Sequence, residues 1–310
     1  MIYDSVIDTI GNTPLIRLRR FCQEMGVNAT LLAKTEGRNP GGSAKDRIAL
    51  GMIRDAERSG KLKPGGTIIE ATSGNTGIGL GLVATVLGYQ VVLTMPETMS
   101  VERQKILRAF GAKLILTPGA KGMAGANEAA EELLKQIPNS IRILQFENPA
   151  NPQSHFDATG PEIWRDCDGK LDAFVAAVGT GGTLCGSGRY LKAQNAAIGV
   201  YGVEPSESPL LSGGHAGPHG IQGIGANFVP DTYDSSVVDD VLTVTTKEAM
   251  DTAKALMQKE GLLCGISSGA AVCGAMKLAA RDSMIGKTIV VLLNDTGERY
   301  ISTPLFDGED

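Results

Sequence analysis

The stretch AFVAAVGTGGTLCGSGRYLKA, residues 173–193, decides the fold. Its first five residues form an apolar run with the composition of a buried strand, and its last ten have the spacing of a helix. The glycine-rich segment VGTGGT, Val178 to Thr183, separates the two. A near-continuous apolar strand that passes through such a turn into a helix is typical of a parallel sheet covered by helices on both faces.

The same pattern extends along the chain in both directions. Helical spacing is visible in segments such as residues 127–137 and 247–261. The short β-branched runs that we interpret as strands are residues 67–72, 90–96, 113–117, 141–146, 173–179, 200–205 and 288–294. This alternation predicts an α/β protein with mostly parallel sheets. The segment QFENPANPQSHF, residues 145–156, contains two prolines and predicts a boundary between two such sheets.

Length and composition exclude several classes of protein. A chain of 310 residues can bury a large core and divide into two domains. The net charge of −5, without a basic block, gives no reason to expect nucleic acid or an anionic membrane as partner. The start, MIYDSVIDTIGN, lacks a signal pattern, and the apolar stretch from Ile78 to Met95 is interrupted by glycines and Gln90. We therefore expect a soluble, cytoplasmic protein.

The cysteines and histidines suggest neither a disulfide framework nor a metal site. The five cysteines form no CxxC pair, which is typical of reduced thiols in the cytosol. They are Cys22, Cys167, Cys185, Cys264 and Cys273. His215 and His219 have no acids or cysteines close in sequence, so we place them in a loop and expect no metal.

The turn VGTGGT is the first of four that could carry chemistry. Three glycines at a strand-to-helix turn expose several backbone N–H groups beside a helix N-terminus, which suits a phosphate. An ordinary tight turn is the alternative. Because GxxxxGK[ST] is absent from the sequence, the pattern favours the monophosphate of a cofactor over a nucleotide triphosphate.

The second turn is EATSGNTGIGLG, Glu70 to Gly81. Gly79, Gly81 and Ala84 match the loose dinucleotide pattern GxGxxA, but they fall inside the expected helix, too late to hold a pyrophosphate. The hydroxyl and amide groups of TSGNTG at a helix start instead suit a carboxylate. The alternative is simple capping by Ser73 or Asn75.

The third and fourth turns are CGISSGAA, residues 264–271, and NPGGSAKDR, residues 39–47. The serines of the third could cap a helix or meet a ring nitrogen of a cofactor. In the fourth, Ser43 and Asp46 form an S-x-x-D pattern, which predicts a capping box and a helix start at about Ser43. Lys45 then lies in the first turn, where the helix dipole and Arg47 lower the pKa of its amine.

Lys45 alone could be an ordinary solvated lysine. A phosphate turn, a carboxylate turn and a partner for a ring nitrogen in the same chain favour another interpretation. A single ligand uses all of them: pyridoxal phosphate in Schiff-base linkage to a lysine, acting on an amino acid.

Several blocks of the sequence resemble the cysteine synthase (O-acetylserine sulfhydrylase) family. These enzymes belong to the tryptophan-synthase-β class of pyridoxal phosphate proteins, fold type II. The similar blocks run in order through nearly the whole chain: KTEGRNPGGSAKDR, EATSGNTGIGL, TMPETMSVERQKILRAFGA, QFENPANPQ, VGTGGT, GVEPSESPLL, PHGIQGIGANFVP, GISSGA and ERYIST.

The resemblance implies two αβα domains of three layers each, with the cofactor in the cleft between them. The first would comprise residues 1–12 and 36–147, and the second residues 13–35 and 148–310. A small subdomain at about 89–133 would close over the substrate and exclude water.

The resemblance also implies a role for individual residues. Lys45 would form the internal aldimine and remove the Cα proton of the substrate, Asn75 would contact the ring O3′, and Ser267 would bond the pyridine nitrogen. The phosphate would lie on Gly179, Thr180, Gly181, Gly182 and Thr183. The carboxylate and the rest of the substrate would meet Thr72, Ser73, Thr76, Gln145, Gly223 and Asn227.

The implied reaction is a β-replacement in cysteine biosynthesis, catalysed by a transferase. O-acetyl-L-serine loses acetate to give an aminoacrylate, and sulfide adds to give L-cysteine. Family members are homodimers, and many bind the C-terminal tail of serine acetyltransferase, so both are expected partners.

Some positions depart from the family pattern. Asn227 replaces a glycine on the substrate side, and Ala44 stands where a larger aliphatic residue is common. Asn294-Asp295 replaces Pro-Ser near the cofactor, and Cys264 replaces Ala or Gly. Asn227 bears on the donor or nucleophile, and Asp295 on the electronics of the cofactor.

Rival interpretations remain open from the sequence. Within the family they are cystathionine β-synthase, a sulfhydrylase that uses O-phosphoserine or thiosulfate, and serine or threonine dehydratase. From other classes they are an NAD-linked oxidoreductase built on GxGxxA and a catalytically silent binding protein.

Overall fold

The computed structural model describes residues 2–307, which form two compact units. The first contains the chain up to Ile10 together with Asn39–Asn151. The second contains Gly11–Arg38 and the chain from Pro152 onward. Each unit has its own sheet, so each is described separately.

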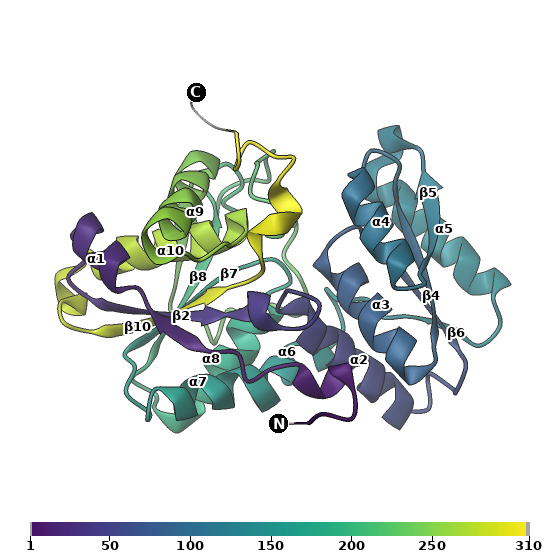
Figure 1. Ribbon diagram of the computed structural model, residues 1–310, viewed down its shortest axis with the longest axis horizontal. Helices are drawn as coiled ribbons and strands as arrows, with labels where there is room; N and C mark the ends of the chain where they lie inside the picture. Colours follow the sequence, from purple (N-terminus) through teal and green to yellow (C-terminus); the bar gives the residue numbers. More distant parts are fainter. Residues whose placement is uncertain (1, 308–310) are drawn as a thin grey trace. The chain divides into compact units, whose positions relative to one another are not determined.

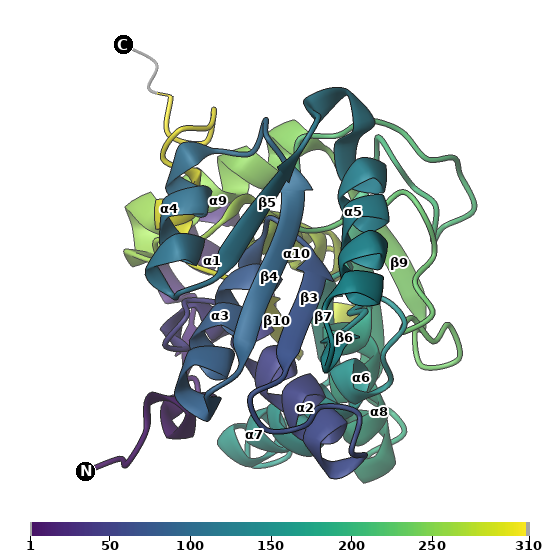
Figure 2. The same ribbon diagram turned by 90° about the vertical axis from the view of Figure 1, so that its right-hand side faces the viewer.

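The first unit is built on a four-stranded parallel sheet in the order β5-β4-β3-β6. The strands are β3 (Thr67–Ala71), β4 (Gln90–Pro96), β5 (Lys113–Thr117) and β6 (Ser140–Arg142). The helices are η1 (Val6–Thr9), α2 (Lys45–Arg58), α3 (Asn75–Leu87), α4 (Val101–Ala109), η3 (Gly119–Lys121) and α5 (Gly122–Gln136). Figure 2 shows α5 on one face of the sheet and α3 and α4 on the other. Both faces of β3 are thereby covered, and all five of its residues are buried.

The second unit has a six-stranded sheet in the order β1-β2-β10-β7-β8-β9, parallel except for the edge strand β1. The strands are β1 (Leu15–Arg17), β2 (Thr30–Thr35), β7 (Ala173–Ala177), β8 (Gly199–Pro205), β9 (Asp240–Val244) and β10 (Thr288–Leu293). In Figure 1, α9 and α10 lie on one side of this sheet and α7 and α8 on the other. The fold is therefore the α/β class with mostly parallel sheets that the alternation of runs predicted.

The helices of the second unit differ in length and type. The long ones are α8 (Gly182–Gln194), α9 (Thr246–Glu260) and α10 (Ile266–Ala279). The shorter ones are α1 (Arg19–Met25), η2 (Glu36–Arg38), α7 (Gly160–Asp166), η5 (Asp282–Met284) and η6 (Gly297–Tyr300). The short α6 (Ala150–Ser154) spans the boundary of the units, and a π-helical turn, η4 (His155–Thr159), follows it.

Two predicted element boundaries were wrong. The strand expected over 141–146 ends at Arg142, because the N–H groups of Ile143 and Leu144 donate to the carboxylate of Glu70 and Leu144 has a left-handed φ of 54°. The capping box expected at Ser43 is absent: α2 begins at Lys45, and Asp46 instead accepts the N–H of Gly41 at 2.6 Å. The helix start is therefore two residues later than the sequence pattern indicated.

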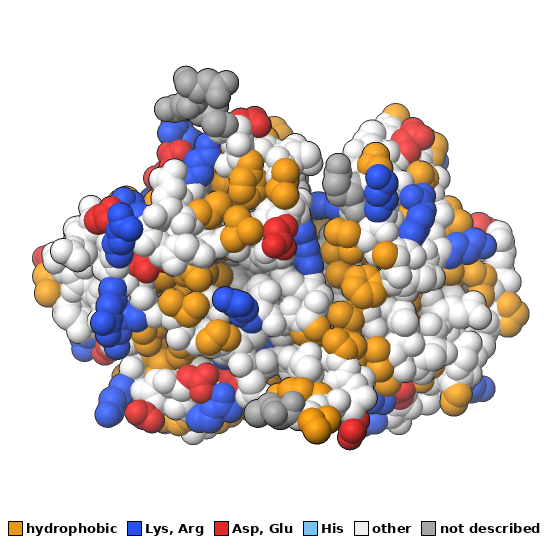
Figure 3. All heavy atoms as spheres, in the orientation of Figure 1, with side chains coloured by type: hydrophobic (Ala, Val, Ile, Leu, Met, Phe, Trp, Pro, Cys, Tyr) orange, Lys and Arg blue, Asp and Glu red, His pale blue; other side chains and the backbone are white. Residues whose placement is uncertain are grey.

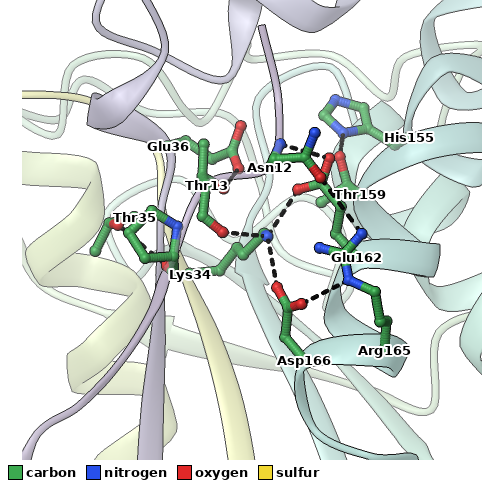
Figure 4. Close-up of polar contacts among 11 residues, drawn as sticks. Asn12, Thr13, Lys34, Thr35, Glu36, His155, Thr159, Glu162, Arg165 and Asp166 are labelled. Carbon is green, nitrogen blue, oxygen red and sulfur yellow. Dashed lines mark hydrogen bonds and ion pairs between the residues drawn. The ribbon is translucent and has the colours of Figure 1, made fainter. Parts of the chain in front are cut away.

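A buried lysine holds the second unit together (Figure 4). The Nζ atom of Lys34, on β2, donates to the carbonyl of Thr13 at 2.6 Å and to Glu162 of α7 at 2.7 Å, with Asp166 at 3.7 Å. Glu162 also accepts the N–H of Asn12 at 2.9 Å. A buried charge is tolerated when it is paired and hydrogen-bonded, so Lys34 has a structural role in joining a strand, a helix and the segment before β1.

The surface does not form a basic tract on the face in Figure 3, where Lys and Arg side chains stand in small separate groups among Asp and Glu. Within residues 2–307, no helix has both the length and the apolar character that a membrane crossing requires. All five cysteines are free thiols.

Candidate functional site

Lys45 is the first residue of α2 and is half-buried. The two helices α2 and α3 approach closely at this point: a Cβ on Gly79 would lie 2.9 Å from the carbonyl oxygen of Lys45 and 3.1 Å from the Cβ of Ala49. A Cβ on Gly81 would lie 3.0 Å from Phe110. The glycines of the GxGxxA pattern therefore serve helix packing within the first unit, which removes the sequence support for dinucleotide binding.

The turn TSGNTG joins β3 to α3. The N-cap of α3 is Gly74, in extended backbone and without a side-chain capping bond, so the interpretation of Ser73 or Asn75 as the cap was wrong. The hydroxyl of Thr72 accepts the N–H of Gly74 at 3.3 Å. Hydroxyl and amide groups thus gather at a helix N-terminus, where the dipole favours an anion.

Gln145 lies three residues after the end of β6 and contacts this turn through Thr76. Its Oε1 accepts the hydroxyl of Thr76 at 2.6 Å, and its carbonyl oxygen accepts the Nδ2 of Asn151 at 2.7 Å. Thr76 and Gln145 are both buried. With Oε1 occupied, the amide nitrogen of Gln145 is the group that can donate to a carboxylate.

Glu70 is a residue whose role the sequence reasoning missed. It is buried at the end of β3, and its carboxylate accepts the N–H groups of Ile143 and Leu144, both at 3.1 Å. Burial raises the pKa of this carboxyl group, against the opposing effect of the backbone hydrogen bonds. These bonds fix the segment that carries Gln145. The signal in the sequence was a carboxylate within an otherwise apolar strand, TIIEA.

In the second unit, the turn from Gly179 to Thr183 joins β7 to α8. A Cβ on Gly179 would lie 2.6 Å from the carbonyl oxygen of Gly223, and Gly181, the N-cap of α8, has a φ of 83°. Only glycine fits both conditions without strain. The hydroxyl of Thr232 donates to the carbonyl of Thr180 at 2.6 Å. The turn is therefore a fixed loop of bare backbone at a helix N-terminus, with the donor groups that a phosphate requires.

Ser267 lies near this turn, in the first turn of α10. It is buried, it does not cap the helix, and a Cβ on Gly223 would be 3.9 Å from its hydroxyl. The Nδ2 of Asn294 donates to Ser267 Oγ at 3.3 Å. The sequence places Gly179, Gly223 and Ser267 far apart, and the structure brings them together within the second unit.

The structure shows the surroundings of Asn294, Asp295 and Cys264, three positions that depart from the family pattern. The carboxylate of Asp295 accepts the hydroxyl of Tyr300 at 2.7 Å and packs against Gly265, whereas Asn294 is the residue that contacts Ser267. Burial raises the pKa of the Cys264 thiol to about 12, so this cysteine is not a thiolate at neutral pH.

Asn227 lines a small pocket of the second unit together with Gly179, Ser208 and Phe228. It has a left-handed φ of 63°, and its Oδ1 accepts the hydroxyl of Ser208 at 2.8 Å. An asparagine tolerates this conformation better than most residues, so it can replace a glycine here. The residue adds an amide group to the pocket that Gly179 also lines.

The histidines of GGHAGPHG, His215 and His219, lie in the segment between β8 and β9. The Nε2 atom of His219 contacts the carbonyl of Gly225 at 2.9 Å. Among residues 2–307, no three His, Cys, Asp or Glu side chains are grouped as metal ligands would be.

Comparisons with known proteins identify the family of this chain. Residues 6–295 match the family described as pyridoxal-phosphate dependent enzymes. Cysteine synthase A of Escherichia coli is 52% identical over 307 residues, covering 96% of this chain and 94% of that protein. A cysteine synthase structure from Entamoeba histolytica superposes with a TM-score of 0.97 at 45% identity, covering all of this chain and 92% of the other. The structure of an O-ureido-L-serine synthase gives a TM-score of 0.95 at 46% identity, covering 100% and 97%.

Proposed function

Because the chain belongs to the family of pyridoxal-phosphate-dependent enzymes, we propose that it is a cysteine synthase that converts O-acetyl-L-serine and sulfide to L-cysteine and acetate. The observation that supports this most strongly is the similarity to cysteine synthase A over 96% of the chain.

The residues present fit the cofactor. The turn from Gly179 to Thr183 offers backbone donors in a loop that a Cβ at Gly179 would disrupt, and we assign it to the phosphate. Ser267 offers a neutral hydroxyl to the pyridine nitrogen, and we assign Asn75 to O3′. When bound, pyridoxal phosphate supplies an electron sink for negative charge at the substrate Cα.

Lys45 is proposed as the covalent attachment point and as the base whose Nζ takes and returns the Cα proton. Its position at the first residue of a 14-residue helix supports this role, because the dipole there disfavours the charged ammonium and favours the neutral amine. A neutral amine is the form that acts as nucleophile or base.

The substrate carboxylate is assigned to the turn at α3, with Thr72, Ser73, Thr76 and Gln145. Its support is the hydrogen bond between Thr76 and Gln145, which leaves the amide nitrogen of Gln145 as donor. Closure of the region at about 89–133 would exclude water, as proposed from the family resemblance. Hydrogen exchange of that region with and without substrate tests this motion.

The absorption spectrum of the purified protein tests the proposal. We expect a yellow protein whose visible band changes when O-acetyl-L-serine is added and returns when sulfide follows, with L-cysteine formed in a stoichiometric amount. Lys45→Ala should abolish both changes. A protein that stays colourless after incubation with pyridoxal phosphate, then dialysis, would contradict the assignment.

A different nucleophile or donor is the second candidate, and Asn227 is the observation that favours it. This residue places an amide beside Gly179 where the family pattern has glycine, and the related O-ureido-L-serine synthase shows that the fold serves another product. Rates with sulfide, thiosulfate and homocysteine, and with O-acetyl- and O-phospho-L-serine as donors, should be compared between the natural protein and Asn227→Gly. A change in preference of about 10-fold or more supports a role for Asn227 in specificity.

The assembly and location are proposed from the family alone. We propose a cytoplasmic homodimer whose partner is the C-terminal tail of a serine acetyltransferase. Light scattering of the purified protein measures the dimer, and titration with such a peptide, monitored by the cofactor absorption, measures the second interaction.

A further inference from the structure

A buried histidine lies directly behind the phosphate turn. His155 Nε2 is 3.0 Å from the hydroxyl of Thr183, the second residue of α8. His155 Nδ1 is 2.8 Å from the hydroxyl of Thr159, and Figure 4 shows these two side chains pointing toward one another. His155 and Thr159 are buried, and all three residues belong to the second unit. The imidazole therefore connects two hydroxyl groups.

The ring is held in place by close packing between the π-helical turn η4 and α8. A Cβ on Gly186 would lie 2.0 Å from the carbonyl of Pro152 and 2.9 Å from His155 Cβ, so the two elements are in near contact. Phe156, the residue after His155, meets Tyr190 of α8 edge to face at 5.6 Å between ring centroids. The guanidinium carbon of Arg189 lies 4.8 Å from the centroid of the Phe156 ring. These contacts hold the backbone that carries His155 against α8, close to Thr183.

The number of available protons determines which group donates in each hydrogen bond of the series Thr159, His155 and Thr183. A threonine hydroxyl has one proton to donate, and an anion can only accept. If Thr183 donates to an anion at the turn, its oxygen must accept from His155, so Nε2 carries a proton. In the neutral ring Nδ1 then accepts the proton of Thr159. The opposite direction would present the lone pairs of Thr183 to the anion.

We propose that His155 is a positioning residue that directs the hydroxyl proton of Thr183 onto the phosphate of the cofactor. This inference rests on the proposed function, in which the turn from Gly179 to Thr183 holds that phosphate. His155 does not touch the phosphate itself. It acts by accepting no proton from Thr183, which leaves that proton free for the anion.

A matched pair of substitutions tests the direction. Glutamine places its amide nitrogen near the position of Nε2, whereas asparagine reaches only the position of Nδ1. The natural protein, His155→Gln and His155→Asn are stripped of cofactor, and the Kd for pyridoxal phosphate is measured by titration. We expect His155→Gln within about 3-fold of the natural protein and His155→Asn weaker by about 10-fold, the loss typical of one hydrogen bond to a charged group.

Pyridoxal, which has no phosphate, is the control ligand. Its affinity should be the same in all three proteins, because His155 acts only through the phosphate. Thr183→Val should weaken pyridoxal phosphate about as much as His155→Asn, and the double variant should be no weaker than Thr183→Val alone. NMR of ¹⁵N-labelled histidine should show a proton on Nε2 of His155 in the loaded protein.

The outcomes separate this inference from the proposed function. If the natural protein binds pyridoxal phosphate but His155→Asn binds it equally well, or if losses in the double variant add, the positioning role is wrong. Equal loss of pyridoxal would also overturn it, since it would indicate general damage to packing. A natural protein that binds neither ligand contradicts the proposed function instead. If His155→Asn fails to fold, the comparison of Thr183→Val with the natural protein and the NMR assignment still decide.

Discussion

The turn at α3 in the first unit and the turn at α8 in the second are built alike. In each, a buried strand of five residues leads into a helix of 13 residues whose N-cap is a glycine without a side-chain capping bond. Both helices therefore leave backbone N–H groups available to a ligand. Their sequences, TSGNTG and VGTGGT, differ in how many side chains surround those groups.

The difference lies in the space around the two N-cap glycines. A Cβ on Gly74 would meet nothing within 4 Å, whereas Gly181 has a left-handed φ and a Cβ there would lie 2.9 Å from Tyr233. The first turn is open and lined by several hydroxyl and amide groups, and the second is packed and consists mainly of glycine backbone with the hydroxyls of Thr180 and Thr183. Side chains can change rotamer as a substrate binds and leaves, whereas a rigid backbone suits a group that remains bound. On the proposed function, we infer that the same local architecture serves two kinds of anion.

Matched substitutions of the two N-cap glycines should have the largest effect. Gly181→Ala forces a left-handed alanine against Tyr233, and we expect it to lower the free energy of unfolding by about 2–4 kcal/mol and to remove retained cofactor. Gly74→Ala should cost below about 1 kcal/mol. Denaturant unfolding and the absorbance of bound cofactor measure both. Equal losses at the two positions would break the comparison.

Removing one hydroxyl from each turn should separate substrate from cofactor. Thr76→Val frees Gln145 Oε1 from its donor, so we expect the KM for O-acetyl-L-serine to rise roughly 10- to 100-fold with the Kd of pyridoxal phosphate nearly unchanged. Thr183→Val should do the reverse. Thr76→Ser keeps the donor and should restore the KM. If either variant changed both the KM for O-acetyl-L-serine and the Kd of pyridoxal phosphate to a similar extent, the two turns would not bind substrate and cofactor separately.

Glu70 should give the smallest effect, because it acts on the first turn only through the segment with Gln145. Burial raises its pKa above the ordinary 4.5, so the folded protein holds the proton more tightly than the unfolded chain. The free energy of unfolding contributed by Glu70 is complete below pH 4.5 and declines as the pH rises through the folded value. Glu70→Gln removes that decline.

The measurement is the difference in Tm between Glu70→Gln and the natural protein at several values of pH. The difference should move in favour of the variant as the pH increases from about 4 to 8. Glu128→Gln is a suitable control, since the side chain of Glu128 is 67% exposed. A flat difference for Glu70→Gln would mean that its proton affinity is the same in the folded and unfolded states.

The strands that the sequence predicted were those with continuous apolar runs. Gln90–Pro96 and Lys113–Thr117 form strands at the predicted residues. The first is buried at every position after Gln90, as its continuous apolar run indicated, whereas the second lies at the edge of the sheet and is recognised by its β-branched and aliphatic run alone. The strand β2 was not predicted, since it carries Lys34, whose buried charge is offset by Glu162, a residue distant in sequence. A sequence pattern reports residues that are close along the chain, and it does not report contacts between residues that are distant in sequence.

The candidate site shows the same limit. The two glycine-rich turns were visible, because strand, glycine and helix follow one another in sequence. Glu70 and His155 were not, since each acts through hydrogen bonds to residues that only the fold brings near. The predicted capping box at Ser43 was wrong because the carboxylate of Asp46 accepts the backbone N–H of Gly41, in the turn before the helix.

The pairing of β2 with β10 has a consequence for synthesis of the protein. All four strands of the first unit lie between Thr67 and Arg142, so its sheet can close while the ribosome is still making the second half of the chain. The strand β2, made earlier, pairs in parallel with β10, which ends at Leu293. Until β10 has been synthesised, one edge of the β1–β2 ribbon has no partner. During that interval the nascent chain is most exposed to wrong pairing with other chains, and cellular folding factors have the most to protect.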